Sequence, residues 1–129
     1  MNKILVEVSV GELLDKISIL EIKKNKIKDP AKLKFITDEH SILKDQLDQN
    51  VKSDDKLNGL FKSLKEINAK LWIIEDDKRM CEKNSDFTEN FIKLSRDVHF
   101  LNDDRANIKL EMNNHSGSKI KEIKEYTSY

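Results

Sequence analysis

The stretch that decides the fold reads LNGLFKSLKEINAKLWIIEDDKRMC over residues 57–81 and FTENFIKLSRDVHFLNDDRANIKLEM over residues 87–112. Mostly apolar residues recur three and four apart in both segments. They form two seams: Leu57, Leu60, Leu64, Ile67, Leu71, Ile74, Lys78 and Cys81, and Phe87, Phe91, Leu94, Val98, Leu101, Arg105, Ile108 and Met112. A repeat averaging about 3.5 residues keeps one stripe of a helix facing one partner helix. The pattern therefore predicts an antiparallel, coiled-coil-like α-hairpin.

Capping signals predict two further helices before this hairpin. Ser9 stands three residues before a glutamate, which is the capping-box spacing and predicts a helix over residues 10–28. The pair Asp29-Pro30 ends that helix, because proline cannot continue it. Proline suits a first helical position after an Asp cap, so the next helix is expected over residues 30–49.

The hairpin helices themselves are expected over residues 56–83 and 86–113, with Asp86 as the cap of the second. Four amphipathic helices in a chain of this length predict a single domain over residues 1–129. The expected fold class is mainly α: the hairpin with two further helices packed against it, as in a four-helix bundle.

The two ends of the chain lie outside these helices. Residues 3–8 alternate and are rich in β-branched types, which predicts a short strand or an extended arm. The tail, residues 119–129, places Ile120, Ile123 and Tyr126 three apart, which fits a helical turn. The tail is also short enough to pair as a strand with residues 3–8. We favour this β pairing of the termini, because a lone strand needs a partner for its backbone groups.

Composition limits the partners and the compartment. Lys and Arg number 24, as do Asp and Glu, so no net charge attracts nucleic acid or an anionic membrane. No nucleic-acid or membrane partner is therefore expected. The longest apolar run is too short to span a bilayer, and the first residues lack the pattern of a signal peptide. A single cysteine, Cys81, ends a seam and is interpreted as a small core residue in a reducing, cytoplasmic setting.

One seam carries an arginine where an apolar side chain belongs. Arg105 is flanked by Leu101 and Ile108, and a buried guanidinium without a partner costs several kcal/mol. It must therefore find a carboxylate or a ligand anion. From the first helix, Asp15 and Glu21 could supply the acid. We favour an internal ion pair that sets helix register, and a polar pocket for a small anion is the alternative.

The hairpin register also predicts contacts between the charged flanks of the two helices. Arg96 comes level with Trp72, near Glu75 and Asp76, which predicts a salt bridge or a guanidinium on the indole face. Two further pairs come level: Arg79 with Glu89, and Lys65 with Asp103. Asp76 also lies on a second apolar stripe where a third helix is expected to pack.

Acidic residues gather in two places, at Glu75, Asp76 and Asp77 and at Asp103 and Asp104. Carboxylates from two helices can hold Mg²⁺ or Mn²⁺ in bundle proteins. The antiparallel register separates the two groups by roughly 15 Å, which is too far for one shared ion. No metal site is therefore assigned, although half-sites completed by the first helix or by a second subunit stay open.

Three segments together resemble a known family: VSVGELLDKISILEIK over residues 8–23, LWIIEDD over residues 71–77 and NDDRA over residues 102–106. They resemble an uncharacterised family of small proteins found in bacteria and their phages, a domain of unknown function. The resemblance covers most of the chain and implies no activity. It implies that the capped first helix and the two acidic segments are the distinctive parts of that family.

The sequence favours a non-enzymatic module for protein–protein interaction or assembly, without a cofactor. A homodimer is expected, since a thin hairpin leaves Phe61, Trp72, Ile73 and Met80 to cover. The alternative is a small anion- or nucleotide-binding enzyme with an Arg/carboxylate pocket, and with Mg²⁺ as its cofactor. The residues for such a pocket are Arg105, Asp104, Asp76, Asp77, Trp72, Arg96, Asp15 and Glu21.

Overall fold

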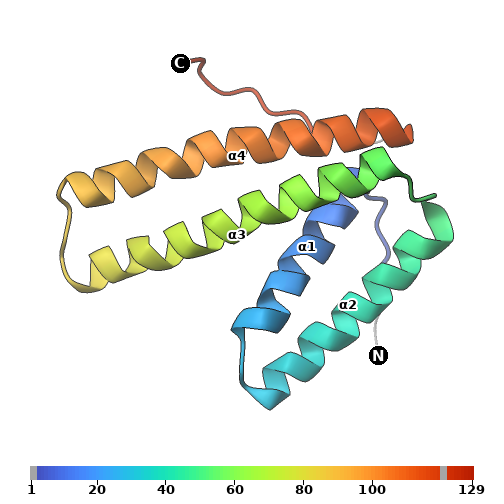
Figure 1. The fold of residues 1–129 in the computed structure, drawn as a ribbon, viewed down its shortest axis with the longest axis horizontal. Coiled ribbons are helices and arrows are strands. Elements are labelled where there is room, and N and C mark those ends of the chain that lie inside the picture. The colour runs from blue at the N-terminus through green and yellow to red at the C-terminus, as the bar shows by residue number, and fades with distance from the viewer. Residues whose placement is uncertain (1–2, 120–121) are drawn as a thin grey trace.

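The computed structural model describes residues 3–119 and 122–129, and within them the chain is mainly α (Figure 1). Its helices are α1 (Val10–Lys26), α2 (Pro30–Asn50), α3 (Asp55–Lys83) and α4 (Glu89–Ser116). The long helices α3 and α4 run antiparallel as the predicted hairpin. The shorter pair α1 and α2 forms a second hairpin that packs against one end of the first.

Three of the predicted helix starts are confirmed by their caps. The Ser9 hydroxyl accepts from the amide of Glu12 at 3.1 Å, and Pro30 opens α2 behind its Asp29 cap. Asp54 caps α3. The capping box at Ser9 is only half formed, because the Glu12 carboxylate binds Lys109 of α4 at 2.8 Å instead of reaching back.

The predicted start and end of the last helix are wrong by three residues each. Asp86 accepts from both the amide and the hydroxyl of Thr88, and this local turn holds the chain out of the helix until Glu89. At the other end α4 continues to Ser116 and stops at Gly117, whose φ of 69° lies in the left-handed region that glycine adopts readily. The first helix ends at Lys26, two residues before its predicted end.

The core lies where α1 crosses the inner half of the hairpin, residues 55–68 and 102–116. Its fully buried members are Leu14, Leu57, Leu64 and Met112. Here α1 approaches α4 closely at Gly11, where an added Cβ would meet the backbone carbonyl oxygen of Lys109 at 2.7 Å. The absence of a side chain at this position allows the two helix backbones to come together.

The outer half of the hairpin, residues 69–101, extends beyond α1 and α2 (Figure 1). Cys81 is buried, as predicted, and it is the sole buried residue in this half. The third helix expected over Asp76 is not there, so Asp76 is exposed and Ile73 is 52% exposed. Phe87, expected inside the seam, is also exposed and contacts Phe91 edge-on.

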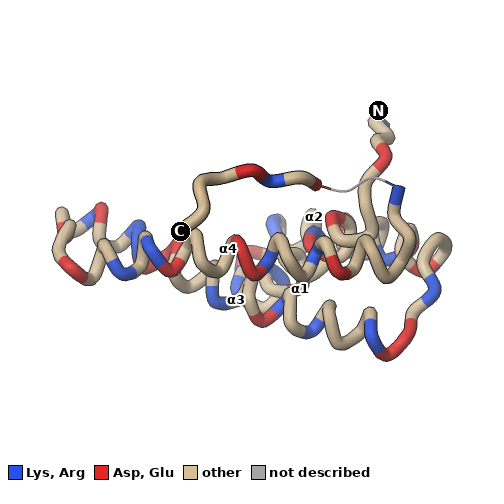
Figure 2. The backbone as a smooth tube through the Cα atoms, turned by 90° about the horizontal axis from the view of Figure 1, so that it is seen from above, with Lys and Arg blue, Asp and Glu red and all other residues tan. Residues whose placement is uncertain are grey.

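The predicted β pairing of the termini is not seen in residues 3–119 and 122–129, which contain no strand. Residues 3–8 are an exposed, extended arm. The tail runs along α4, as Figures 1 and 2 show, and the ring of Tyr129 packs against His99 and Phe100. Ile120, on which the alternative of a helical turn partly rested, lies outside the described residues.

Candidate functional site

A cleft of about 490 Å³ lies in the angle between the second half of α1 and the hairpin. All three helices contribute side chains to it. The lining residues are Ile19 and Ile22 of α1, Asn68, Leu71, Trp72, Glu75, Asp76 and Arg79 of α3, and Asn102 and Arg105 of α4. The cleft thus combines an indole and three aliphatic side chains with two guanidinium groups, two carboxylates and two amides.

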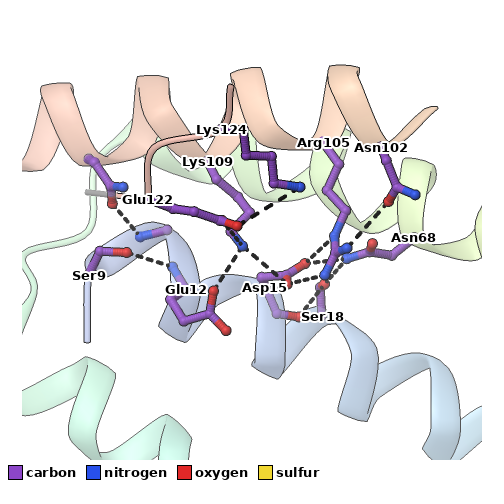
Figure 3. A network of polar contacts seen from close by, with 12 residues as sticks. Ser9, Glu12, Asp15, Ser18, Asn68, Asn102, Arg105, Lys109, Glu122 and Lys124 are labelled. Atoms are coloured by element: carbon purple, nitrogen blue, oxygen red, sulfur yellow. Dashed lines mark hydrogen bonds and ion pairs between the residues drawn. The ribbon is translucent and has the colours of Figure 1, made fainter. Parts of the chain in front are cut away.

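Arg105, which lines the cleft, forms an ion pair with the buried Asp15 (Figure 3). Nε of Arg105 donates to Oδ1 of Asp15 at 3.0 Å, and Nη2 donates to Oδ2 in a second, short contact. The Asp15 side chain is 3% exposed and that of Arg105 is 26% exposed. The prediction that α1 supplies an acid for the seam arginine is therefore confirmed for Asp15.

Neighbouring polar groups fix the carboxylate of Asp15 in place. Nδ2 of Asn68 donates to Oδ1 of Asp15 and to the Ser18 hydroxyl, both at 2.8 Å. The Ser18 hydroxyl in turn donates to the backbone carbonyl of Asp15 at 2.8 Å. On the far side, Nζ of Lys109 lies 3.6 Å from Oδ2 of Asp15. These contacts link α1, α3 and α4 through one buried carboxylate (Figure 3).

The network keeps its members charged. Burial alone would raise the pKa of Asp15, but hydrogen bonds from Arg105 and Asn68 lower that pKa below its ordinary value. The same hydrogen bond with Asp15 raises the pKa of Arg105. Burial would lower the pKa of Lys109, yet its bond to Glu12 and the charge of Asp15 raise it. Asp15, Arg105 and Lys109 therefore form a network that is ionised and fixed in place.

Arg105 keeps part of its donor capacity for the cleft that it lines. A guanidinium has five N–H groups. Two are used by Asp15, and a third reaches Oδ1 of Asn102 at a long 3.5 Å. The other two have no partner among the described residues. Asp15 thus orients the guanidinium without using all of its N–H donors.

The α3 wall of the cleft carries charges that no described residue neutralises. Trp72, Glu75, Asp76 and Arg79 stand at intervals of three and four, which places them on one face of the helix. None of the three charged members has an ion pair with any residue of the described ranges. Glu75 and Arg79 have the i,i+4 spacing at which ion pairs often form.

That absence contrasts with other helices of the same protein. Lys34 pairs with Asp38 at 2.9 Å, and Lys93 pairs with Asp97 at 2.7 Å, both at i,i+4 spacing on exposed surfaces. The charged side chains of the cleft wall are therefore left available for other contacts.

The structure brings together some of the predicted site residues and separates others. Asp15, Trp72, Asp76 and Arg105 form or line the cleft. Asp77 and Asp104 are exposed and lie outside its lining. Glu21 also lies elsewhere.

The Glu21 carboxylate binds Lys65 at 2.9 Å and His40 at 3.3 Å, so it ties α1 to α3 and to α2. Burial would raise the pKa of Glu21, but the hydrogen bonds from Lys65 and His40 lower it. The predicted pair of Lys65 with Asp103 is consequently wrong.

Two other predicted contacts of the hairpin flanks are wrong. The guanidinium of Arg96 lies over the ring of Phe100, 5.9 Å from its centroid, and not on Trp72. Arg96 and Phe100 lie four positions apart on α4, so Arg96 contacts this neighbour on its own helix instead of Trp72 on α3. Arg79 points to the cleft and does not pair with Glu89 in the described part of the chain.

Sequence reasoning missed Asn68, Asn102 and Lys109. Asn68 had a usable signal, because it lies four residues before Trp72 on the same helix face. Lys109 had one too, since it follows Arg105 by one helical turn. In the described ranges, no three or more His, Cys, Asp or Glu side chains are grouped as metal ligands. None of the helices there has the length and apolarity needed to cross a membrane.

Comparison with known proteins gives one match. A family model described as "Family of unknown function (DUF6165)" matches residues 4–129. No curated protein and no solved structure gives a significant match. The expected resemblance to an uncharacterised family is thereby confirmed.

Proposed function

The chain belongs to DUF6165, a family of unknown function, and we propose that this protein binds a small anionic ligand in the cleft between α1 and the hairpin. The observation that carries the proposal is the state of Arg105. Its guanidinium lines the cleft, is held by the buried Asp15, and keeps two N–H groups that have no partner among the described residues.

A fixed guanidinium is a favourable anion receptor. Its planar donors match the oxygens of a phosphate or carboxylate. Because Asp15 already holds Arg105 in one orientation, little side-chain freedom is lost when a ligand binds. Asp15 also compensates the charge of Arg105, so Arg79 is the second cationic group of the cleft, whose lining also contains the carboxylates of Glu75 and Asp76.

Trp72 offers a direct test, since it is the sole tryptophan of the chain and lines the cleft. We expect its fluorescence to change on titration with inorganic phosphate. The variant Arg79→Ala should weaken the phosphate affinity about tenfold, as expected for loss of one charged hydrogen-bonding partner. Its unfolding midpoint should stay unchanged, because Arg79 is exposed and has no ion pair with any residue that the structure describes.

Arg96→Ala is the matched control, because Arg96 is on the same hairpin but outside the cleft. It should bind phosphate as the wild type does. A wild-type protein that does not respond to phosphate, or an Arg79→Ala variant with wild-type affinity, would overturn the proposal.

A second candidate function is assembly with another copy of this chain. The outer half of the hairpin has no third layer, and Ile73, Met80 and Ile92 are 52%, 47% and 54% exposed there. Apolar side chains on an uncovered helix pair favour an interface. Since Lys plus Arg balance Asp plus Glu, two copies would not repel each other. A cytoplasmic homodimer is part of this second proposal.

Sedimentation of the full chain tests the homodimer. We expect a dimer for the wild type and a monomer for Ile73→Glu. Phe35→Glu is the control, because Phe35 is 77% exposed on α2, away from the outer half of the hairpin. A wild-type chain that stays monomeric at high concentration would contradict the assembly proposal and leave the anion site untouched.

A further inference from the structure

We infer that the ligand of the cleft is a hydroxylated phosphate ester, of the kind found in sugar phosphates, an inference that rests on the proposed anion site. Two opposite kinds of polar group lie in the same cleft. Arg79 and Arg105 can only donate hydrogen bonds, whereas ionised Glu75 and Asp76 can only accept them.

A bare anion satisfies only half of this arrangement. Phosphate oxygens accept from the guanidinium groups, but they would face the carboxylates of Glu75 and Asp76 with like charge. A ligand that also carries hydroxyl groups can donate to these carboxylates. One molecule with a phosphate at one end and hydroxyls at the other therefore matches both groups.

The amides of the cleft also fit hydroxyl groups. Asn68 lines the cleft, and its Nδ2 is used by Asp15 and Ser18, so its Oδ1 is the atom left to act as an acceptor. Asn102 accepts from Arg105 through Oδ1, which leaves its Nδ2 as a donor. A hydroxyl both donates and accepts, and so it can use either amide.

The remaining wall is apolar. Trp72 lies beside the aliphatic side chains of Ile19, Ile22 and Leu71. Such a surface can cover the C–H face of a sugar ring, which is the less polar side of the molecule. The volume of about 490 Å³ lies within the range of small-molecule sites, about 300–1,000 Å³, and accommodates a phosphorylated ring.

The test compares four probes on the full chain by Trp72 fluorescence and calorimetry: inorganic phosphate, glucose, glucose 6-phosphate and adenosine monophosphate. Glucose 6-phosphate should bind about tenfold tighter than inorganic phosphate, because hydrogen bonds to the carboxylates add to the anion contacts. Glucose alone should bind far more weakly than either. Adenosine monophosphate is also a phosphate ester of a hydroxylated sugar. Tighter binding of glucose 6-phosphate would identify the ligand as a sugar phosphate, and tighter binding of adenosine monophosphate would identify it as a nucleotide.

Substitution of the carboxylates tests the assignment of roles. The double variant Glu75→Gln with Asp76→Asn should bind inorganic phosphate as well as the wild type or better, because two negative charges are gone. Its preference for glucose 6-phosphate should fall to about twofold or less, because neutral amides replace charged acceptors. Asp77→Asn, one residue outside the lining, is the matched control and should keep the full preference.

Each outcome decides between the two levels of the proposal. Equal affinity of the wild type for phosphate and glucose 6-phosphate would overturn this inference and leave the anion site standing. An unchanged preference in the double variant would overturn it as well. Failure of every phosphate-bearing probe to bind would overturn the proposed function itself. Both acids are exposed, so the variants should fold, which circular dichroism checks.

Discussion

The inner and outer halves of the α3–α4 hairpin follow the same seam pattern but differ in burial and in whether α1 supplies a partner for their charged side chains. The inner half buries Leu57, Leu64 and Met112 and pairs Arg105 with Asp15. The outer half buries Cys81 alone and leaves Glu75 and Arg79 unpaired within the described residues. The difference is α1, which crosses one half and not the other (Figure 1). The seam brings α3 and α4 together, and the position of α1 determines which of their side chains are buried.

The largest expected effect comes from breaking the ion pair of the inner half. Asp15→Asn leaves the half-buried guanidinium of Arg105 beside a neutral amide, which should lower the free energy of unfolding by about 3 kcal/mol, the lower end of the range for a buried pair. Urea unfolding measures this change. In the outer half, Asp77→Asn should change this free energy by less than about 0.5 kcal/mol, because Asp77 is exposed and forms no ion pair within residues 3–119 and 122–129. Equal effects in the two halves would contradict the comparison.

Acid should remove the contribution of Asp15 to the free energy of unfolding over a defined pH range. The pKa of Asp15 in the folded chain lies below its ordinary value of 3.8, so the unfolded chain takes up the proton first. The stabilisation is therefore present above about pH 4 and is lost as the pH falls through the folded pKa. Unfolding free energies of wild type and Asp15→Asn, measured from pH 7 to pH 2, should converge only at the acid end. Convergence already near neutral pH would show that Asp15 is not held ionised.

A smaller loss is expected at the helix crossing of the inner half. Gly11→Ala would place a Cβ 2.7 Å from the carbonyl oxygen of Lys109 and 3.1 Å from its Cα, and backbone atoms cannot step aside cheaply. We expect a loss of about 1–3 kcal/mol, typical of overpacking, by urea unfolding. If Gly11→Ala is neutral, then α1 and α4 do not approach as closely as described.

The smallest expected effect is an increase in the free energy of unfolding. Gly59 lies in α3, and apart from its chain neighbours and the adjacent helix backbone no atom of the described residues lies within 4 Å of an added Cβ. Gly59→Ala should raise the free energy of unfolding by about 0.5–1 kcal/mol, because alanine loses less backbone freedom in a helix. The same substitution should thus have opposite signs at Gly11 and Gly59. A loss at Gly59 would indicate a contact at this position that the structure does not contain.

The sequence was sufficient for the helices and for the hairpin, because periodicity and caps are local. It also predicted that an acid of α1 meets Arg105, since an unpaired guanidinium in a seam is costly. It could not choose between Asp15 and Glu21. These residues are about 9 Å apart along α1, and only the crossing position of the helix decides which one faces Arg105. Glu21 lands instead beside Lys65 and His40.

The cleft could not be predicted from the sequence, because it also depends on where α1 crosses the hairpin. Register along the hairpin placed Arg96 level with Trp72, but it did not give the rotation of each side chain, and Arg96 turns to Phe100. Asn102 carries no pattern of its own, and the signal for Asn68 is limited to its place four residues before Trp72. Both asparagines join Trp72 in one lining only because α1 diverges from α3 at this point. Local turn chemistry explains the late start of α4, where Asp86 binds Thr88.

The most direct test of the account is a nitrogen–proton NMR spectrum of the full chain titrated with glucose 6-phosphate. We expect the indole Nε1 signal of Trp72 and the Nε signals of Arg79 and Arg105 to shift together, while the Nε signal of Arg96 stays in place. Shifts confined to Arg96, or no shift at Trp72 and Arg79, would contradict the claim that the uncovered charges of the hairpin form a ligand site.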